Sequence, residues 1–190
     1  MKVGVLAVQG AFAEHEQALN ELGIECVELR QKSDLKENIS GLVFPGGEST
    51  VQGKLIRELD MYDTIKNHIN EGMPVLATCA GLILLADNLS NDPVVHLGTL
   101  PVTVKRNAYG RQLGSFATDH DIKIGGQTIA DFPMRFIRAP YIESTADDVE
   151  VCAEVDGNTV MVRYKNQLAL SFHPELTKDY RIHQIFKNML

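Results

Sequence analysis

The chain has 190 residues, of which 44% are hydrophobic and 23% are charged, and its formal net charge is −7. These proportions are typical of a folded globular protein and exclude a disordered chain. The negative charge, with Lys and Arg scattered along the chain, argues against a nucleic-acid-binding surface and against binding to an anionic membrane. The length suits one domain with a substantial core, so we expect residues 1–190 to form a single domain.

The cysteine content and the apolar segments bear on the cellular compartment. Cys26, Cys79 and Cys152 are an odd number of cysteines without a C-x-x-C pair, so neither a disulfide framework nor a thiolate zinc site is expected. A reducing cytoplasm fits best. The apolar run 3–8 is short and lacks a small-residue cleavage site, which favours a strand over a signal peptide. No segment approaches the roughly 18 apolar residues that a membrane-spanning helix needs.

The first part of the chain alternates apolar strands with an amphipathic helix. Continuous apolar runs, which indicate strands buried on both faces, occupy residues 3–8, 25–29 and 42–44, and helical spacing of apolar residues covers 11–22. This β-α-β order implies a parallel sheet covered by helices. We therefore predict an α/β fold with a mostly parallel central sheet and helices on both faces.

The third predicted strand leads directly into a glycine pair, Gly46 and Gly47. Glycines let the backbone turn its N–H groups toward a ligand, because no Cβ stands in the way. A phosphate-binding loop is rejected, since the spacing across 47–54 is one residue too long and Leu55 replaces the Ser or Thr that would bind magnesium. A plain turn before the next helix stays open as the alternative.

The segment 74–86 passes from a short apolar strand, through small residues, into a helix-forming stretch, with Cys79 at the bend. A side chain on such a tight turn is held out of the sheet and in front of a helix N-terminus. The positive end of the helix favours thiolate over thiol, which is how a fold displays a nucleophile. An inert core cysteine is the alternative that this segment alone leaves open.

A helix is expected at 62–71, and after residue 88 the pattern changes to short β-prone segments separated by Gly, Asn and Asp. Such segments are typical of antiparallel strands or hairpins, and they cover 98–105, 112–117, 121–124 and 127–131. We predict a short antiparallel excursion and then a return to the main sheet. Further strands are expected at 149–155, 159–164 and 167–172, and an amphipathic helix at 182–190.

Polar residues within the excursion allow several interpretations. Arg138 follows a hydrophobic strand and should lie at its end, where an arginine can bind a carboxylate bidentately. The segment 105–111, which contains Arg106, is either a ligand contact or a solvated turn. Asp119, His120 and Asp121 could bind metal, but no further ligand cluster supports them, and we predict no metal site.

His173 and Glu175 follow the last predicted strand, two residues apart. In an extended chain such residues project from the same face about 6.6 Å apart, so the carboxylate can brace the imidazole. In Cys-His catalysis the imidazole accepts the thiol proton, and a third group fixes its tautomer. Cys79, the glycine pair and His173 together therefore indicate a nucleophilic site. The remaining histidines considered, which are His15, His68, His96 and His183, have no companions that suggest chemistry.

The segments 45–50, 77–82 and 171–177 together resemble the class I, or triad, glutamine amidotransferases. The chain is more closely similar to the family of glutaminase subunits of pyridoxal 5′-phosphate synthases, since 9–11, 106–112 and 137–140 also match. The resemblance covers essentially the whole chain and implies a flavodoxin-like fold. One departure is Ala77, where many members have glycine, although alanine is still small enough for the turn.

This resemblance implies that Cys79, His173 and Glu175 form a triad that hydrolyses L-glutamine to L-glutamate and ammonia through a thioester. It also implies an oxyanion hole made by the backbone N–H groups of Gly47 and Ala80. The implied glutamine contacts are Gly46, Gly47, Glu48, Arg106, Ile137 and Arg138. Physically, an arginine suits the α-carboxylate of glutamine, and Glu48 suits its ammonium group.

The resemblance further implies a partner, a (β/α)₈-barrel synthase subunit in a hetero-oligomeric complex, which uses the ammonia to make pyridoxal 5′-phosphate (vitamin B6). It implies no cofactor for this chain, and weak activity until docking orders the oxyanion loop. Two rival classes remain. A thiol-based redox sensor would not require His173 or Glu175, and a degenerate amidotransferase domain would serve only as an interaction module.

Overall fold

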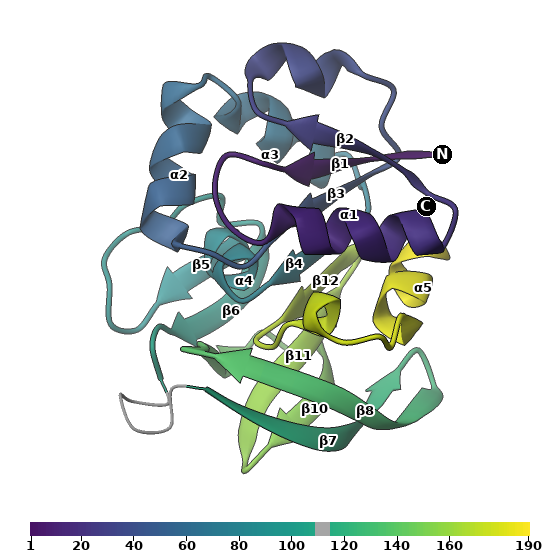
Figure 1. The fold of residues 1–190 in the computed structure, drawn as a ribbon. Coiled ribbons are helices and arrows are strands. Elements are labelled where there is room, and N and C mark those ends of the chain that lie inside the picture. Colours follow the sequence, from purple (N-terminus) through teal and green to yellow (C-terminus); the bar gives the residue numbers. More distant parts are fainter. Residues whose placement is uncertain (109–114) are drawn as a thin grey trace.

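The computed structural model describes residues 1–108 and 115–190, which form a mixed sheet with helices on both faces (Figure 1). The first part of the strand predicted at 112–117 lies outside the described residues. Within the described ranges, no helix is both long enough and apolar enough to span a bilayer.

The parallel part of the sheet has five neighbouring strands in the order β2-β1-β3-β4-β12. Their bounds are Lys2–Leu6 for β1, Glu25–Leu29 for β2, Gly41–Phe44 for β3, Val75–Thr78 for β4 and Gln167–Leu170 for β12. Every residue of β3, β4 and β12 is buried, as expected for strands covered on both faces. The predicted α/β class with a mostly parallel core is confirmed.

The rest of the main sheet is largely antiparallel. Strand β11 (Asn158–Tyr164) runs antiparallel to β12 and also pairs with β10 (Glu150–Val155) and β9 (Tyr141–Thr145). Strand β9 pairs antiparallel with β6 (Leu100–Lys105), and β5 (Ala86–Leu89) runs parallel to β6. The sequence patterns did not predict β5 or β9.

A separate two-stranded hairpin consists of β7 (Ser115–Ile124) and β8 (Gln127–Ile137). The short strands predicted at 121–124 and 127–131 are the paired ends of this longer hairpin. The antiparallel excursion is therefore present, and its strands continue through polar residues that the prediction had treated as breaks.

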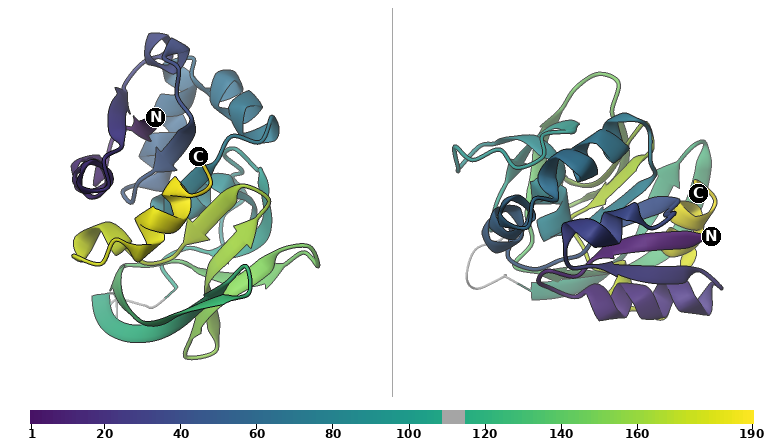
Figure 2. Two further views of the ribbon diagram at one scale, coloured as in Figure 1. Left: turned by 90° about the vertical axis from the view of Figure 1, so that its right-hand side faces the viewer. Right: turned by 90° about the horizontal axis from the view of Figure 1, so that it is seen from above.

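The helices lie on opposite faces of the sheet (Figures 1 and 2). One face carries α1 (Phe12–Glu21), α5 (Arg181–Lys187) and the β7-β8 hairpin, and the other carries α2 (Ser49–Glu58), α3 (Tyr62–Asn70) and α4 (Ala80–Leu85). Alternation along a strand produces this division, because Val75 and Ala77 belong to one apolar cluster and Leu76 to the other. Two short 3₁₀ helices, η1 (Lys32–Lys36) and η2 (Pro174–Leu176), complete the elements.

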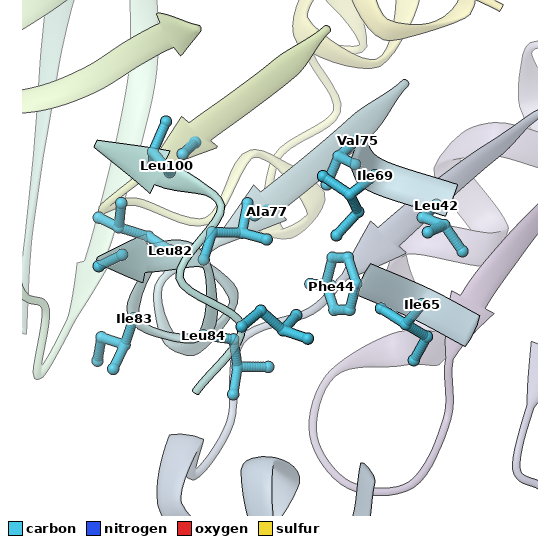
Figure 3. Packing of buried hydrophobic residues seen from close by; sticks show 14 of the residues in the cluster. Leu42, Phe44, Ile65, Ile69, Val75, Ala77, Leu82, Ile83, Leu84 and Leu100 are labelled. Carbon is cyan, nitrogen blue, oxygen red and sulfur yellow. The ribbon is translucent and has the colours of Figure 1, made fainter. Parts of the chain in front are cut away.

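The apolar cluster beneath α2, α3 and α4 fixes the helix that follows Cys79. Figure 3 shows the ring of Phe44 on β3 near Ile65 of α3 and the α4 side chains gathered beside β4. Phe44 and Leu82 are both essentially inaccessible to solvent. Burying one such side chain contributes about 1.5–3 kcal/mol, so this packing holds α4 firmly against the carboxyl end of β4.

The carboxyl ends of β1, β3, β4 and β12 all lie at one edge of the parallel sheet. Directly after these ends come Gln9, the Gly46-Gly47 pair, Cys79 and His173. In open α/β sheets this edge is where ligands bind. The fold therefore brings together the separate chemical segments of the sequence.

Candidate active site

Cys79 occupies the sharp corner between β4 and α4. Its backbone has φ 50° and ψ −99°, and its N–H group donates a hydrogen bond to the Leu170 carbonyl oxygen at 2.8 Å. A non-glycine residue in such a conformation costs roughly 1–3 kcal/mol, which the surrounding packing must offset. Gly81 permits the corner, since a Cβ there would lie 2.2 Å from the Phe44 carbonyl oxygen. The fold thus holds one side chain in a strained position at the edge of the sheet.

His173 lies between Cys79 and Glu175. Its Nδ1 atom is 2.7 Å from Glu175 Oε1, and its backbone N–H donates to the Arg135 carbonyl oxygen at 2.8 Å. The Cys79 side chain lies close enough to the ring to raise the pKa of His173. Pro174 starts the 3₁₀ helix η2 instead of continuing the extended chain that the sequence suggested. The carboxylate therefore reaches the imidazole through a helical turn, and not from the same face of a strand.

The electrostatics of this trio favour an imidazolium. Burial alone would lower the pKa of His173, but the hydrogen bonds with Cys79 and Glu175 outweigh burial and raise that pKa to about 10. Burial would raise the pKa of the Glu175 carboxyl, yet the neighbouring His15 and His173 rings outweigh it and lower the pKa below its ordinary value. A carboxylate, an imidazolium and a sulfur are thus aligned in that order.

A pocket of about 280 Å³ opens in front of Cys79 and His173. It brings together nine of the ten residues proposed from the sequence, and the tenth, Glu175, lies behind the His173 ring. The nine are Gly46, Gly47, Glu48, Cys79, Ala80, Arg106, Ile137, Arg138 and His173. Gln9 and Gly10, which follow β1, line the same pocket.

The glycine segment packs tightly against the imidazole. A Cβ on Gly46 would lie 2.3 Å from Cε1 of His173, so a larger residue there would collide with the ring. The Gly46 carbonyl oxygen accepts a hydrogen bond from the Ala11 N–H at 3.0 Å, and the Glu48 N–H donates to Gln9 Oε1 at 2.8 Å. Gln52, which the sequence did not single out, donates to the Gln9 and Pro45 carbonyl oxygens. These contacts join the segment to the loop after β1.

The two pocket arginines have different surroundings. Arg106 is ion-paired with Asp92 and donates to Thr50 Oγ1 at 3.2 Å. Arg138, with φ 43°, donates from Nη2 to Glu48 Oε1 at 3.2 Å, and both side chains of that pair are largely exposed. The mouth of the pocket therefore presents a guanidinium and a carboxylate whose charges neutralise each other.

Behind Glu175 lie His15 and His183, for which the sequence patterns indicated no companions, and the structure gives both of them close polar neighbours. His15 Nε2 is 3.4 Å from Glu175 Oε2 and 3.1 Å from Thr78 Oγ1, and His15 Nδ1 is 3.2 Å from Nε2 of His183. All four side chains are fully or almost fully buried. Burial lowers the pKa of His15 and lowers that of His183 to about 3, so burial favours the neutral form of both rings. The one sequence signal was that His15 occupies the apolar face of a helix.

The described residues contain no group of three or more His, Cys, Asp or Glu side chains arranged to hold a metal ion. Asp119, His120 and Asp121 follow one another along β7, where their side chains alternate between the two faces of the hairpin.

Known proteins resemble this chain over almost its whole length. The model of the SNO glutamine amidotransferase family matches residues 5–190. Pyridoxal 5′-phosphate synthase subunit PdxT of Desulfitobacterium hafniense (strain DSM 10664 / DCB-2) is 61% identical over 186 residues, covering 98% of this chain and 92% of that protein. The subunit of the same name from Streptococcus pneumoniae (strain CGSP14) is 51% identical over 192 residues, covering 100% and 97%.

Solved structures show the same architecture. A crystal structure of a glutamine amidotransferase superposes with a TM-score of 0.90 at 44% identity and covers 98% of this chain and 97% of that one. PurLQS from Thermotoga maritima superposes with a TM-score of 0.69 at 17% identity, covering 98% and 97%, which shows a shared fold alone.

Proposed function

This chain belongs to the SNO glutamine amidotransferase family, and from that premise we propose that it hydrolyses L-glutamine to L-glutamate and ammonia for a pyridoxal 5′-phosphate synthase. The observation that carries the proposal is the alignment of Cys79, His173 and Glu175 at one pocket, with 2.7 Å between His173 Nδ1 and Glu175 Oε1. The PdxT relatives, at 51% and 61% identity, support the assignment to this synthase.

In the proposed reaction the Cys79 thiolate attacks the side-chain amide carbon of glutamine, and the carbonyl π electrons move onto oxygen. Backbone N–H groups of Gly47 and Ala80 stabilise this oxyanion, and losing one such donor typically costs about 10²- to 10³-fold in rate. The tetrahedral intermediate collapses, the C–N bond breaks, and the His173 imidazolium protonates the departing ammonia. A thioester remains. Water then attacks the thioester with His173 as general base, releasing glutamate and the thiolate.

Glutamine recognition is proposed at the mouth of the pocket, through Gly46, Gly47, Glu48, Arg106, Ile137 and Arg138. The amino acid offers an α-carboxylate and an α-ammonium, and the Arg138–Glu48 ion pair offers the complementary charges. Binding would exchange this exposed pair for two pairs with the substrate. Arg106 has Asp92 as a neutralising partner, so it adds a donor without adding net charge.

The reaction also needs an acceptor for its product. Ammonia that escapes into water is protonated and ceases to be a nucleophile, so we propose delivery to a docked (β/α)₈-barrel synthase subunit in a hetero-oligomeric complex. We further propose that docking raises the glutaminase activity, because a glycine pair can reorient at low cost. The chain acts in this proposal as a single domain, 1–190. A reducing cytoplasm suits its three free cysteines.

The test is to incubate the chain with L-glutamine, with and without the synthase subunit, and to measure glutamate and ammonia. The wild type is expected to release both in equal amounts, faster with the synthase, and Cys79→Ala to release neither. No glutamate from the wild type with its partner would refute the proposal. A redox sensor would instead oxidise Cys79 without consuming glutamine, and an interaction module would bind the synthase without turnover.

A further inference from the structure

Two buried histidines from opposite ends of the chain meet behind the proposed triad. His15 comes from α1 and His183 from α5, and α1 packs against the short helix η2 that carries Glu175. Neither ring lines the pocket. We propose that His15 is a positioning residue for the triad, whose Nε2–H holds the second carboxylate oxygen of Glu175, and that His183 fixes the His15 tautomer that makes this contact. The inference rests on the proposed function.

One carboxylate oxygen of Glu175 lacks a hydrogen-bond donor. Its side chain is fully buried, and Oε1 accepts from His173, but Oε2 has no hydrogen-bond partner among residues 1–108 and 115–190. A buried carboxylate oxygen without a donor is costly. His15 Nε2, at 3.4 Å, is the nitrogen that faces it. Active-site hydrogen bonds are often long without substrate and tighten in the reacting complex.

The position of the His15 proton decides whether its Nε2 atom attracts or repels this oxygen. If neutral His15 carried its hydrogen on Nδ1, the lone pair of Nε2 would face the carboxylate oxygen and repel it. With the hydrogen on Nε2, the ring can donate to Glu175 Oε2 or to Thr78 Oγ1. Nδ1 then becomes an acceptor, and it lies 3.2 Å from His183 Nε2.

The surroundings of His183 decide which of its ring nitrogens carries the hydrogen. Its Nδ1 atom is buried and has no hydrogen-bond partner within the described chain, so a hydrogen placed there would be an unsatisfied donor. The ring therefore carries its hydrogen on Nε2 and donates to His15 Nδ1. The result is a one-way chain of donors, from His183 to His15 to Glu175, that ends on the carboxylate beside His173. Burial keeps both rings neutral, since it lowers the pKa of each.

The consequence for catalysis is geometric. A carboxylate held at both oxygens keeps Oε1 in line with His173 Nδ1, which presents the other ring nitrogen to Cys79. Without His15, the carboxylate is free to rotate, and the imidazole loses its fixed tautomer and direction. Because neither histidine touches the pocket, the turnover number should fall while the Michaelis constant for glutamine stays nearly unchanged.

The test compares His15→Leu, His15→Gln and His15→Asn, each assayed with the synthase subunit. Loss of a hydrogen bond to a buried charge corresponds to about a 10- to 100-fold lower kcat for His15→Leu, with KM within about twofold. The Gln amide nitrogen reaches the position of Nε2, so His15→Gln should recover most of kcat. The Asn amide nitrogen reaches only the position of Nδ1, so His15→Asn should stay slow.

A matched control separates positioning from packing. Leu19 is buried on the same helix, one turn after His15, and belongs to an apolar cluster that contains none of the three triad residues. Leu19→Ala should lower the melting temperature, as truncation of a buried leucine does, and retain kcat. If His15→Leu fails to fold, the contrast between His15→Gln and His15→Asn, both polar, still decides the question.

A double-mutant cycle supplies the last readout. In a Glu175→Gln background, His15→Leu should reduce kcat by less than about twofold, because the group it positions is already lost. Wild-type kcat in His15→Leu, equal kcat in His15→Gln and His15→Asn, or an undiminished effect in the Glu175→Gln background would overturn the inference. Absence of glutamate release by the wild type with its partner would instead refute the proposed function.

Discussion

Two buried histidine environments flank the Glu175 carboxylate, and they shift the histidine pKa in opposite directions. His173, on the pocket side, has its pKa raised to about 10, because contacts with Cys79 and Glu175 outweigh its burial. His183, on the inner side, has its pKa lowered to about 3 by burial and by its neighbour His15. His15 also faces the carboxylate, but at 3.4 Å instead of 2.7 Å. Burial alone therefore favours a neutral imidazole, whereas a carboxylate at hydrogen-bonding distance favours the imidazolium.

The most direct test of this difference is to remove each histidine ring in a separate variant. His173→Ala should reduce glutamate release by about 10⁴-fold, because general acid–base catalysis contributes up to about that factor. His183→Leu should reduce it by about tenfold or less, since that ring acts only through His15. Steady-state glutaminase assays with the synthase present check both values. Equal losses in the two variants would contradict the division of roles.

Moving the pocket-side ring without removing it should have the next largest effect. Gly46→Ala places a methyl group 2.3 Å from Cε1 of His173, so the ring must shift. A misplacement of about 1 Å can cost about 10²-fold in rate, and we expect a loss of that order in kcat. Gly126→Ala is the control, because nothing lies within 4 Å of the added Cβ, so any strain from its φ of 76° arises outside the pocket. Full activity in Gly46→Ala would show that the ring has room to spare.

The pH dependence of stability should differ in sign between the two environments. The raised pKa of His173 stabilises the fold fully below about pH 6.5, and this contribution is lost as the pH rises toward about 10. The lowered pKa of His183 leaves its ring uncharged, so stability present above about pH 6.5 is lost as the pH falls toward about 3.

Denaturant unfolding measures these opposite slopes. The difference in unfolding free energy between the wild type and His173→Gln should shrink from pH 6.5 to 10. The corresponding difference for His183→Gln should shrink from pH 6.5 to 3. Differences that stay constant across both windows would mean that neither ring has the proton affinity assigned to it.

The smallest stability effect is expected at the mouth of the pocket, where charges are exposed and not buried. Arg138→Ala should change the unfolding free energy by less than about 0.5 kcal/mol, because its ion pair with Glu48 is solvated. It should still raise KM for glutamine about tenfold, since it removes a partner for the α-carboxylate. Lys54→Ala, which breaks the exposed pair with Glu58 outside the pocket, is the control and should alter neither quantity.

The sequence predicted the parallel core well, because strands such as 42–44 and 75–78 are buried on both faces and must be apolar throughout. It did not predict β9 or the full hairpin of β7 and β8. Those strands carry polar residues such as Asp119 and Glu143, and their ladder hydrogen bonds do not depend on side-chain burial. Pattern reasoning detects strands by their apolar faces, and it shortens strands that are partly solvated.

The same reasoning gave the residues that line the pocket but missed those that support them. Cys79 and His173 were found because each follows a predicted strand, and strand ends converge in this fold. His15 and His183 are 168 residues apart, and no spacing rule relates them. Their contact depends on how α1 and α5 pack over one face of the sheet. The 3₁₀ turn after His173 was likewise missed, although Pro174 at its first position favours it.

The central place of β12 has a consequence for biosynthesis. This strand, made of residues 167–170, is inserted between β4 and β11, and His173 and Glu175 follow it directly. A ribosome therefore releases the cysteine corner long before the chain that flanks it on one side of the sheet. Until that late strand emerges, β4 has an open edge and the nascent chain has a thiol without an imidazole. Cys79 therefore meets its histidine and carboxylate neighbours only after residues 167–175 have emerged from the ribosome.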